Sequence, residues 1–191
     1  MEKRVEEDGK YTIYAGYNEQ SWSVNPAIEL LAYKMCLKYG ISVSEKLGVD
    51  ADLREMWQRI YNGLAAQPVI ENYGEEGHAV LALAEQSWNG EEWVVSDDPM
   101  IAGTNCIALE SVVPGEVFGY YSADKDLEVV RNTVKFFLGK GAWIDGNSFP
   151  KLFTAAINTR YDCAEIVAAL ASSVRAQMQL NMMIEDRGHG I

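Results

Sequence analysis

The residues best suited to chemistry are acidic and amide side chains that lie close to tryptophans at two places in the chain. Glu19 precedes Trp22, and Trp143, Asp145 and Asn147 share the run W-I-D-G-N. An indole beside Glu19 would form an apolar wall that raises the pKa of its carboxyl group, as a general acid requires. The glycine between Asp145 and Asn147 permits a tight turn, from which both could reach the hydroxyl groups of a ligand while Trp143 stacks on its ring. A surface glutamate and an ordinary turn are the plain alternatives.

The histidines and cysteines indicate little metal or cofactor chemistry. The chain has 2 histidines, far apart, and 3 cysteines that form no C-x-x-C pair, so neither a zinc site nor a disulfide framework is expected. It contains no Walker loop and no G-x-G-x-x-G motif. The sequence therefore predicts no cofactor and no metal, and His189 is either a ligand-site residue or a histidine in a frayed tail.

A second constellation follows the order of a papain-like peptidase. The run V-N-P-A at 24–27 would begin the nucleophile helix, His78 would be the base and Asp98 the orienting carboxylate. Val24 offers no nucleophile, however, and Cys36 lies about three turns further along the predicted helix. This interpretation predicts at most a degenerate peptidase that has lost its nucleophile.

Composition restricts the partners of the chain. Its 191 residues suit one domain with a sizeable core, and Asp+Glu outnumber Lys+Arg by 28 to 16, for a net charge of -12. A polyanion such as nucleic acid is therefore an unlikely ligand by charge, and a neutral or basic ligand is easier to accept. No signal peptide and no apolar run of about 20 residues is present, which predicts no membrane partner and a cytoplasmic location. Export by a signal outside this chain is the alternative.

Apolar periodicity predicts a mainly helical fold with a small β-hairpin insertion. Asn89-Gly90 favours a hairpin turn between two apolar runs, within residues 79–96. The first helix carries two apolar stripes and is expected to be the most buried. The domain is expected to cover 11–186, between a flexible N-terminus at 1–10 and a tail at 187–191. The predicted helices lie at about 25–40, 50–62, 123–138, 149–157 and 162–186.

Four pieces of the sequence, taken in order, resemble a known family of enzymes. They are N-P-A-I-E-L with L-G-V-D, then P-G-E-V-F-G, then W-I-D-G-N-S, and finally G-H-G-I. In this order they resemble the catalytic domain of α-L-fucosidase-type glycoside hydrolases (family ninety-five) and their uncharacterised relatives. The likeness runs from about residue 17 to the end of the chain.

The resemblance implies part of an (α/α) toroid of helical hairpins and an inverting glycosidase that acts on, or binds, a glycoside or oligosaccharide. An inverting enzyme uses one carboxylic acid and one carboxylate about 6.5–9.5 Å apart. Glu19 would be the acid, and the presumed base of the family would lie beyond Ile191, so catalysis by this chain alone is left open. The residues that the resemblance places around the sugar are Trp22, Trp143, Asp145, Asn147 and His189.

The alternative to a partial catalytic domain is a non-catalytic helical protein that binds carbohydrate or protein. A further expectation concerns self-association through the last predicted helix. Leu170, Val174, Met178 and Met182 recur near helical spacing, and methionine suits adaptable contacts. More apolar surface is present there than one buried stripe requires.

Overall fold

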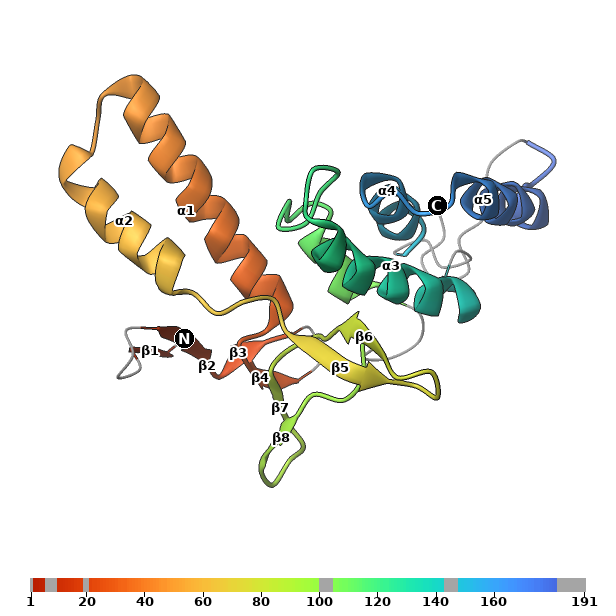
Figure 1. The fold of residues 1–191 in the computed structure, drawn as a ribbon, viewed down its shortest axis with the longest axis horizontal. Coiled ribbons are helices and arrows are strands. Elements are labelled where there is room, and N and C mark those ends of the chain that lie inside the picture. Colours follow the sequence, from red (N-terminus) through yellow and green to blue (C-terminus); the bar gives the residue numbers. More distant parts are fainter. Residues whose placement is uncertain (1, 6–9, 19–20, 100–104, 143–147, 182–191) are drawn as a thin grey trace.

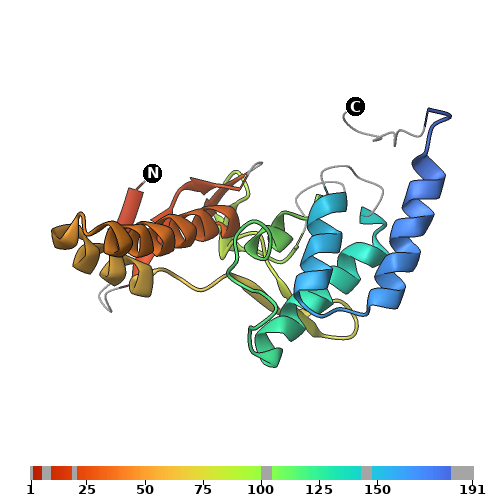
Figure 2. The same cartoon turned by 90° about the horizontal axis from the view of Figure 1, so that it is seen from above.

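The chain forms an elongated molecule with helices at both ends and short strands between them. The computed structural model describes residues 2–5, 10–18, 21–99, 105–142 and 148–181. Two long helices form a hairpin at one end, and the other helices gather at the opposite end (Figure 1). The same separation is visible from above (Figure 2).

A helix is present at each of the five predicted places, and the described residues add one short 3-10 helix, η1. The lengths of the first and last helices differ from the prediction. Among the described residues, no helix combines the length and the apolar character needed to cross a bilayer. The helices are α1 (Ala27–Leu47), α2 (Ala51–Gly63), η1 (Ile107–Ser111), α3 (Asp124–Gly139), α4 (Phe149–Asn158) and α5 (Cys163–Gln177).

Within the described part of the chain, eight short strands pair in three antiparallel sheets. The four-stranded sheet has the order β3-β4-β7-β8, and the pairs β1-β2 and β5-β6 form the two others. Residues 2–5, expected within a flexible terminus, pair with β2. The strands are β1 (Glu2–Val5), β2 (Tyr11–Tyr14), β3 (Gly16–Tyr17), β4 (Trp22–Val24), β5 (Val69–Tyr73), β6 (His78–Leu81), β7 (Gln86–Trp88) and β8 (Trp93–Val95).

The predicted toroid is therefore wrong, and the fold is mixed α/β. A toroid needs successive helical hairpins arranged around one axis, whereas here strands and a 3-10 helix separate α2 from α3. The two groups of helices lie at opposite ends of the molecule (Figure 1). Local periodicity identified the helices correctly, but it carries no information about which helices pack together.

The predicted hairpin at 79–96 is half right. Its turn at Asn89-Gly90 joins β7 to β8, with Trp88 opposite Trp93. The first arm, however, belongs to another sheet, because β6 pairs with β5. Leu81, Ala82, and the apolar residues that follow are buried, so this run behaves as core rather than as a hairpin arm.

The expectation that the first helix is the most buried is also wrong. In α1, Leu30 and Leu31 are buried near the beginning, and Ser44 is the only buried residue in its second half. Gly40 lies inside the helix, which continues until Gly48 adopts a left-handed conformation with φ of 69°. Most of α1 therefore extends away from the body of the molecule and packs on α2 (Figure 1).

The hydrophobic core lies under α3. Four apolar residues at helical spacing in α3 are fully buried: Leu127, Val130, Val134 and Phe137. Val130, Val134 and Phe137 pack with buried residues of β6, η1, α4 and α5. By contrast, α2 has no buried residue.

The last helix ends earlier than predicted. α5 stops at Gln177, and Met178 adopts an extended conformation at its C-cap. Leu170 and Val174 are half-buried on the helix, whereas Met182 lies outside the described residues. The apolar stripe thus does not run continuously along one helix to Met178 and beyond, and self-association through this segment stays a prediction.

Candidate functional site

Of the residues predicted to act on a sugar, Trp22 alone can be placed. It begins β4, is 54% exposed, and its ring meets that of Tyr17 edge-on at 5.2 Å between centroids. The structure therefore neither assembles nor separates the predicted set. The predicted residues outside the described part of the chain are Glu19, Trp143, Asp145, Asn147 and His189.

Trp22 belongs to a row of aromatic side chains on one face of the four-stranded sheet. Tyr17 lies opposite Trp22 in the pairing of β3 with β4. Ser23 pairs with Ser87 and Val24 with Gln86, and continuing this register by one residue places Trp22 opposite Trp88. Trp88 in turn lies opposite Trp93. Because opposite residues share a face of a sheet, we define Tyr17, Trp22, Trp88 and Trp93 as the aromatic row.

The aromatic row is accessible to a ligand. Tyr17 and Trp88 are 46% and 37% exposed, and Trp93 is partly buried. The ring centroids of Trp88 and Trp93 are 5.3 Å apart, an edge-on contact that holds both rings in place. Three strand spacings separate the ends of the row, or roughly 14 Å.

The turn between β7 and β8 fixes two members of the aromatic row. Asn89 Oδ1 accepts hydrogen bonds from the backbone N–H groups of Glu91 and Glu92, each at 2.9 Å. Gly90 takes a φ of 108°, which a residue with a Cβ rarely adopts. This local chemistry explains why the Asn-Gly signal in the sequence located the turn correctly.

A polar cavity of about 670 Å³ lies on the same side of the sheet as the aromatic row. Its lining includes Val24 and Gln86. Val24 lies two residues after Trp22 in β4, and Gln86 lies two residues before Trp88 in β7, so each shares a face of the sheet with its tryptophan. Tyr14 also lines the cavity, and its ring is 5.2 Å from that of Trp93. The cavity and the aromatic row therefore form one continuous surface.

Asn25 and Glu85 are two of the polar side chains that line this cavity. Asn25 Nδ2 donates to Glu85 Oε2 at 2.7 Å, and Asn25 Oδ1 accepts from the backbone N–H of Ile13 at 2.9 Å. Asn25 is buried and has a φ of 48°, and its side chain links β2 to the end of β4 and to Glu85. Glu85 is exposed, and its second carboxylate oxygen can accept from a ligand.

Sequence reasoning missed Trp88, Trp93, Tyr14 and Glu85. The hairpin signal at Asn89-Gly90 could have revealed two of them, because residues that flank a hairpin turn face each other. The alignment of Trp22 with Trp88 had no such signal, since it depends on a pairing between strands more than 60 positions apart. The contribution of Tyr14 depends on tertiary packing as well.

The residues that follow the papain-like order line three different cavities. Val24 lines the cavity beside Asn25, His78 lines a second near α3, and Asp98 lines a third. His78 Nε2 lies 2.9 Å from Glu76 Oε2, and Lys135 and His78 together hold the pKa of Glu76 below its ordinary value. The described residues thus offer no assembled nucleophile, base and orienting group.

The described residues contain no metal-binding cluster, that is, no group of three or more histidine, cysteine, aspartate or glutamate side chains placed to hold a metal ion. Comparisons of the chain with protein-family models, with curated proteins and with solved structures found no match.

Proposed function

We propose that this chain binds a neutral oligosaccharide along the aromatic row and in the adjoining polar cavity. The observation that carries the proposal is the alignment of Tyr17, Trp22, Trp88 and Trp93 across all four strands of one sheet. The resemblance noted in the sequence analysis predicts the same class of ligand.

Aromatic rings suit a sugar because a pyranose presents apolar C–H groups on its faces. A ring fixed by its neighbours stacks on such a face with little loss of side-chain freedom. Exposed aromatic rings aligned in one direction therefore favour a chain of sugars over a compact ligand. A neutral ligand also avoids repulsion from the net charge of -12.

The polar cavity supplies the hydrogen bonds that stacking lacks. Glu85 and Gln86 can bind sugar hydroxyl groups directly, and Asn25 holds the carboxylate of Glu85 in position. A few oriented polar groups beside an apolar surface are typical of small-ligand sites. The geometry therefore supports one end of the oligosaccharide in the cavity and the rest along the aromatic row.

Binding is supported better than cleavage. An inverting glycosidase needs two carboxyl groups about 6.5–9.5 Å apart across the scissile bond. Glu85 is the single carboxylate among the described residues that line the cavity. We expect no release of chromophore from aryl glycosides. Turnover that disappears in Glu85→Gln would mean instead that the chain is an enzyme.

Screening of the purified chain on an array of neutral glycans, followed by calorimetry with the best ligand, tests the proposal. We expect Trp22→Ala and Trp88→Ala each to weaken binding about 10-fold or more, which corresponds to about 1.4 kcal/mol. Tyr121→Ala is the matched control, because Tyr121 is 96% exposed and lies outside the aromatic row. Retained affinity in both tryptophan variants, or no bound glycan, would refute the proposal.

A further inference from the structure

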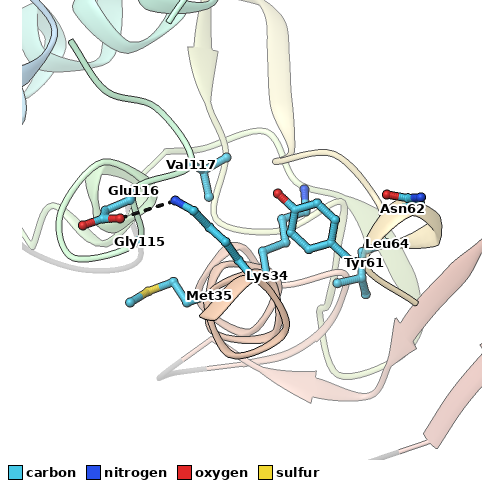
Figure 3. A pocket seen from close by; sticks show the side chains of 9 residues that line it. Lys34, Met35, Tyr61, Asn62, Leu64, Gly115, Glu116 and Val117 are labelled. Carbon is cyan, nitrogen blue, oxygen red and sulfur yellow. Dashed lines mark hydrogen bonds and ion pairs between the residues drawn. The ribbon is translucent and has the colours of Figure 1, made fainter. Parts of the chain in front are cut away.

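A separate cavity of about 330 Å³ lies between α1, α2 and the turn at 115–117 (Figure 3). Lys34 and Lys38 enter it from one face of α1, because residues four positions apart lie one above the other on a helix. Tyr61 enters from the end of α2. Two lysines in one cavity are unexpected in a chain with a net charge of -12.

The charges in this cavity do not cancel. The side chain of Glu116 accepts an ion-pair contact, drawn as a dashed line in Figure 3, from Lys38 Nζ at 3.5 Å from its Oε2. The hydroxyl of Tyr39 donates to the same carboxylate oxygen. Lys34 has no ion pair or hydrogen bond with any described residue. With Glu116 occupied by Lys38, the ammonium group of Lys34 leaves one uncompensated positive charge.

Partial burial makes that charge unfavourable without a ligand. Burial lowers the pKa of Lys34, because the ammonium form loses part of its hydration. An anion in the cavity would restore the lost interaction. Asn62 can assist: Gln58 donates to its side-chain oxygen at 3.0 Å, which leaves the amide N–H groups of Asn62 able to donate.

Three apolar side chains also line the cavity: Met35 on α1, Leu64 just after α2, and Val117 in the turn at 115–117 (Figure 3). A ligand that contacts both Lys34 and these side chains needs an anionic head and a short hydrocarbon part. We propose that this cavity binds a small organic monocarboxylate, with its carboxylate on Lys34 and its apolar part against these three side chains.

Charge and size argue for this ligand over other anions. A single uncompensated positive charge matches a monoanion, whereas a phosphate dianion would bring a second negative charge close to Glu116. The volume is near the lower end of ligand pockets, which span about 300–1,000 Å³, so a ligand of a few carbons fits. The site lies apart from the aromatic row, although Asn62 and Leu64 also line the cavity that adjoins that row.

Calorimetric titration of the whole chain with butyrate tests the proposal, with butanol and inorganic phosphate as comparison ligands. We expect butyrate to bind with a one-to-one stoichiometry, and the two comparison ligands to bind at least about 10-fold more weakly, because each loses either the charge match or the apolar contact. No binding of butyrate, or phosphate bound as tightly as butyrate, would overturn the proposal.

Two lysine variants locate the site. Lys34→Met keeps the length of the side chain and removes its charge, and we expect it to weaken butyrate binding about 10-fold or more. Lys46→Met is the matched control, because Lys46 is exposed near the end of the same helix. Equal losses in the two variants, or none in Lys34→Met, would contradict the assignment.

Two further measurements separate a lost ligand contact from a damaged fold. Lys34→Arg keeps the positive charge, so we expect it to recover most of the affinity lost in Lys34→Met. In the native chain, butyrate affinity should decline as the pH rises through the lowered pKa of Lys34, which is below that of an ordinary lysine. If the butyrate affinity stays constant until the pH reaches the ordinary pKa of lysine, or if Lys34→Arg recovers no affinity, the ligand binds elsewhere.

Discussion

The helices α2 and α3 have similar amphipathic patterns, but they differ in how far their apolar residues are buried. Both carry one apolar stripe in the sequence. In α3 the stripe is fully buried, whereas α2 has no buried residue, and Leu53 and Met56 in its stripe are 38% and 40% exposed. An apolar stripe therefore indicates which face of a helix can be covered, and the tertiary structure decides whether anything covers it.

The same contrast extends to the regions around these helices. The region of α3, α4 and η1 is held together by a continuous apolar core. The region of α1, α2 and the four-stranded sheet depends more on specific polar links, among them Asn25 with Ile13 and Glu85, and Glu29 with the backbone of Tyr17. Both proposed ligand sites lie in this second region, where side chains stay accessible.

Phe137→Ala should produce the largest loss of stability. Phe137 is fully buried in the core, and removal of its ring leaves a cavity that neighbouring side chains cannot fill, so we expect a decrease of about 3–5 kcal/mol in the free energy of unfolding. Leu53→Ala in α2 should change it by less than about 1 kcal/mol. Urea unfolding followed by circular dichroism measures both, and equal losses would remove the contrast between the two helices.

Asn25 tests whether polar links hold the second region. Asn25→Ala removes two side-chain hydrogen bonds. It also places alanine, which cannot hydrogen-bond to the nearby backbone as asparagine does, at a φ of 48°. We therefore expect the free energy of unfolding to decrease by about 2–3 kcal/mol. Asn25→Gly loses the same bonds without the backbone strain and should be about 1 kcal/mol more stable than Asn25→Ala. If the two variants unfold at the same urea concentration, strain at this position is not important.

Thr133 provides a polar test inside the apolar region. Its hydroxyl accepts from the backbone N–H of Leu81 at 2.8 Å and donates to the carbonyl of Val129, which joins β6 to α3. Thr133→Val keeps the shape but leaves the Leu81 N–H unsatisfied, so we expect a loss of about 1–2 kcal/mol in urea unfolding. Thr154→Val is the control, because Thr154 is exposed on α4. Similar values for both would show that the link contributes nothing.

The smallest effect concerns Tyr161 and alkaline pH. Burial, a hydrogen bond to Glu165, and the charges of Glu165 and Asp162 raise the pKa of Tyr161 from 10.0 to about 12. Between these values the folded chain keeps a proton that the unfolded chain loses, so stability should fall as the pH rises through this range.

Melting temperatures measured from pH 9 to pH 11.5 test this link. We expect Tyr161→Phe to lose less stability than the native chain over that range, because it has no phenol to titrate. Tyr121→Phe, at an exposed position, should follow the native chain. A steeper loss in Tyr161→Phe than in the native chain would contradict the sign of the effect.

Some features of the fold could be predicted because they depend on residues close together in the chain. All five helices, the buried stripe of α3 and the hairpin turn at Asn89-Gly90 follow from periodicity and from turn chemistry over a few positions. The toroid was wrong because it required a decision about which helices pack together. The burial of α1 was wrong for the same reason, since two apolar stripes do not guarantee two neighbours.

The sequence by itself determined the negative charge and the approximate positions of the helices. Only the tertiary structure decided that Trp22 aligns with Trp88, that β6 pairs with β5, and that Lys34 shares a cavity with Tyr61. These outcomes depend on the register of strands and the docking of helices that are distant in sequence. A shift of one residue in register would turn each side chain of a strand to the other face of its sheet, and no local pattern sets that register.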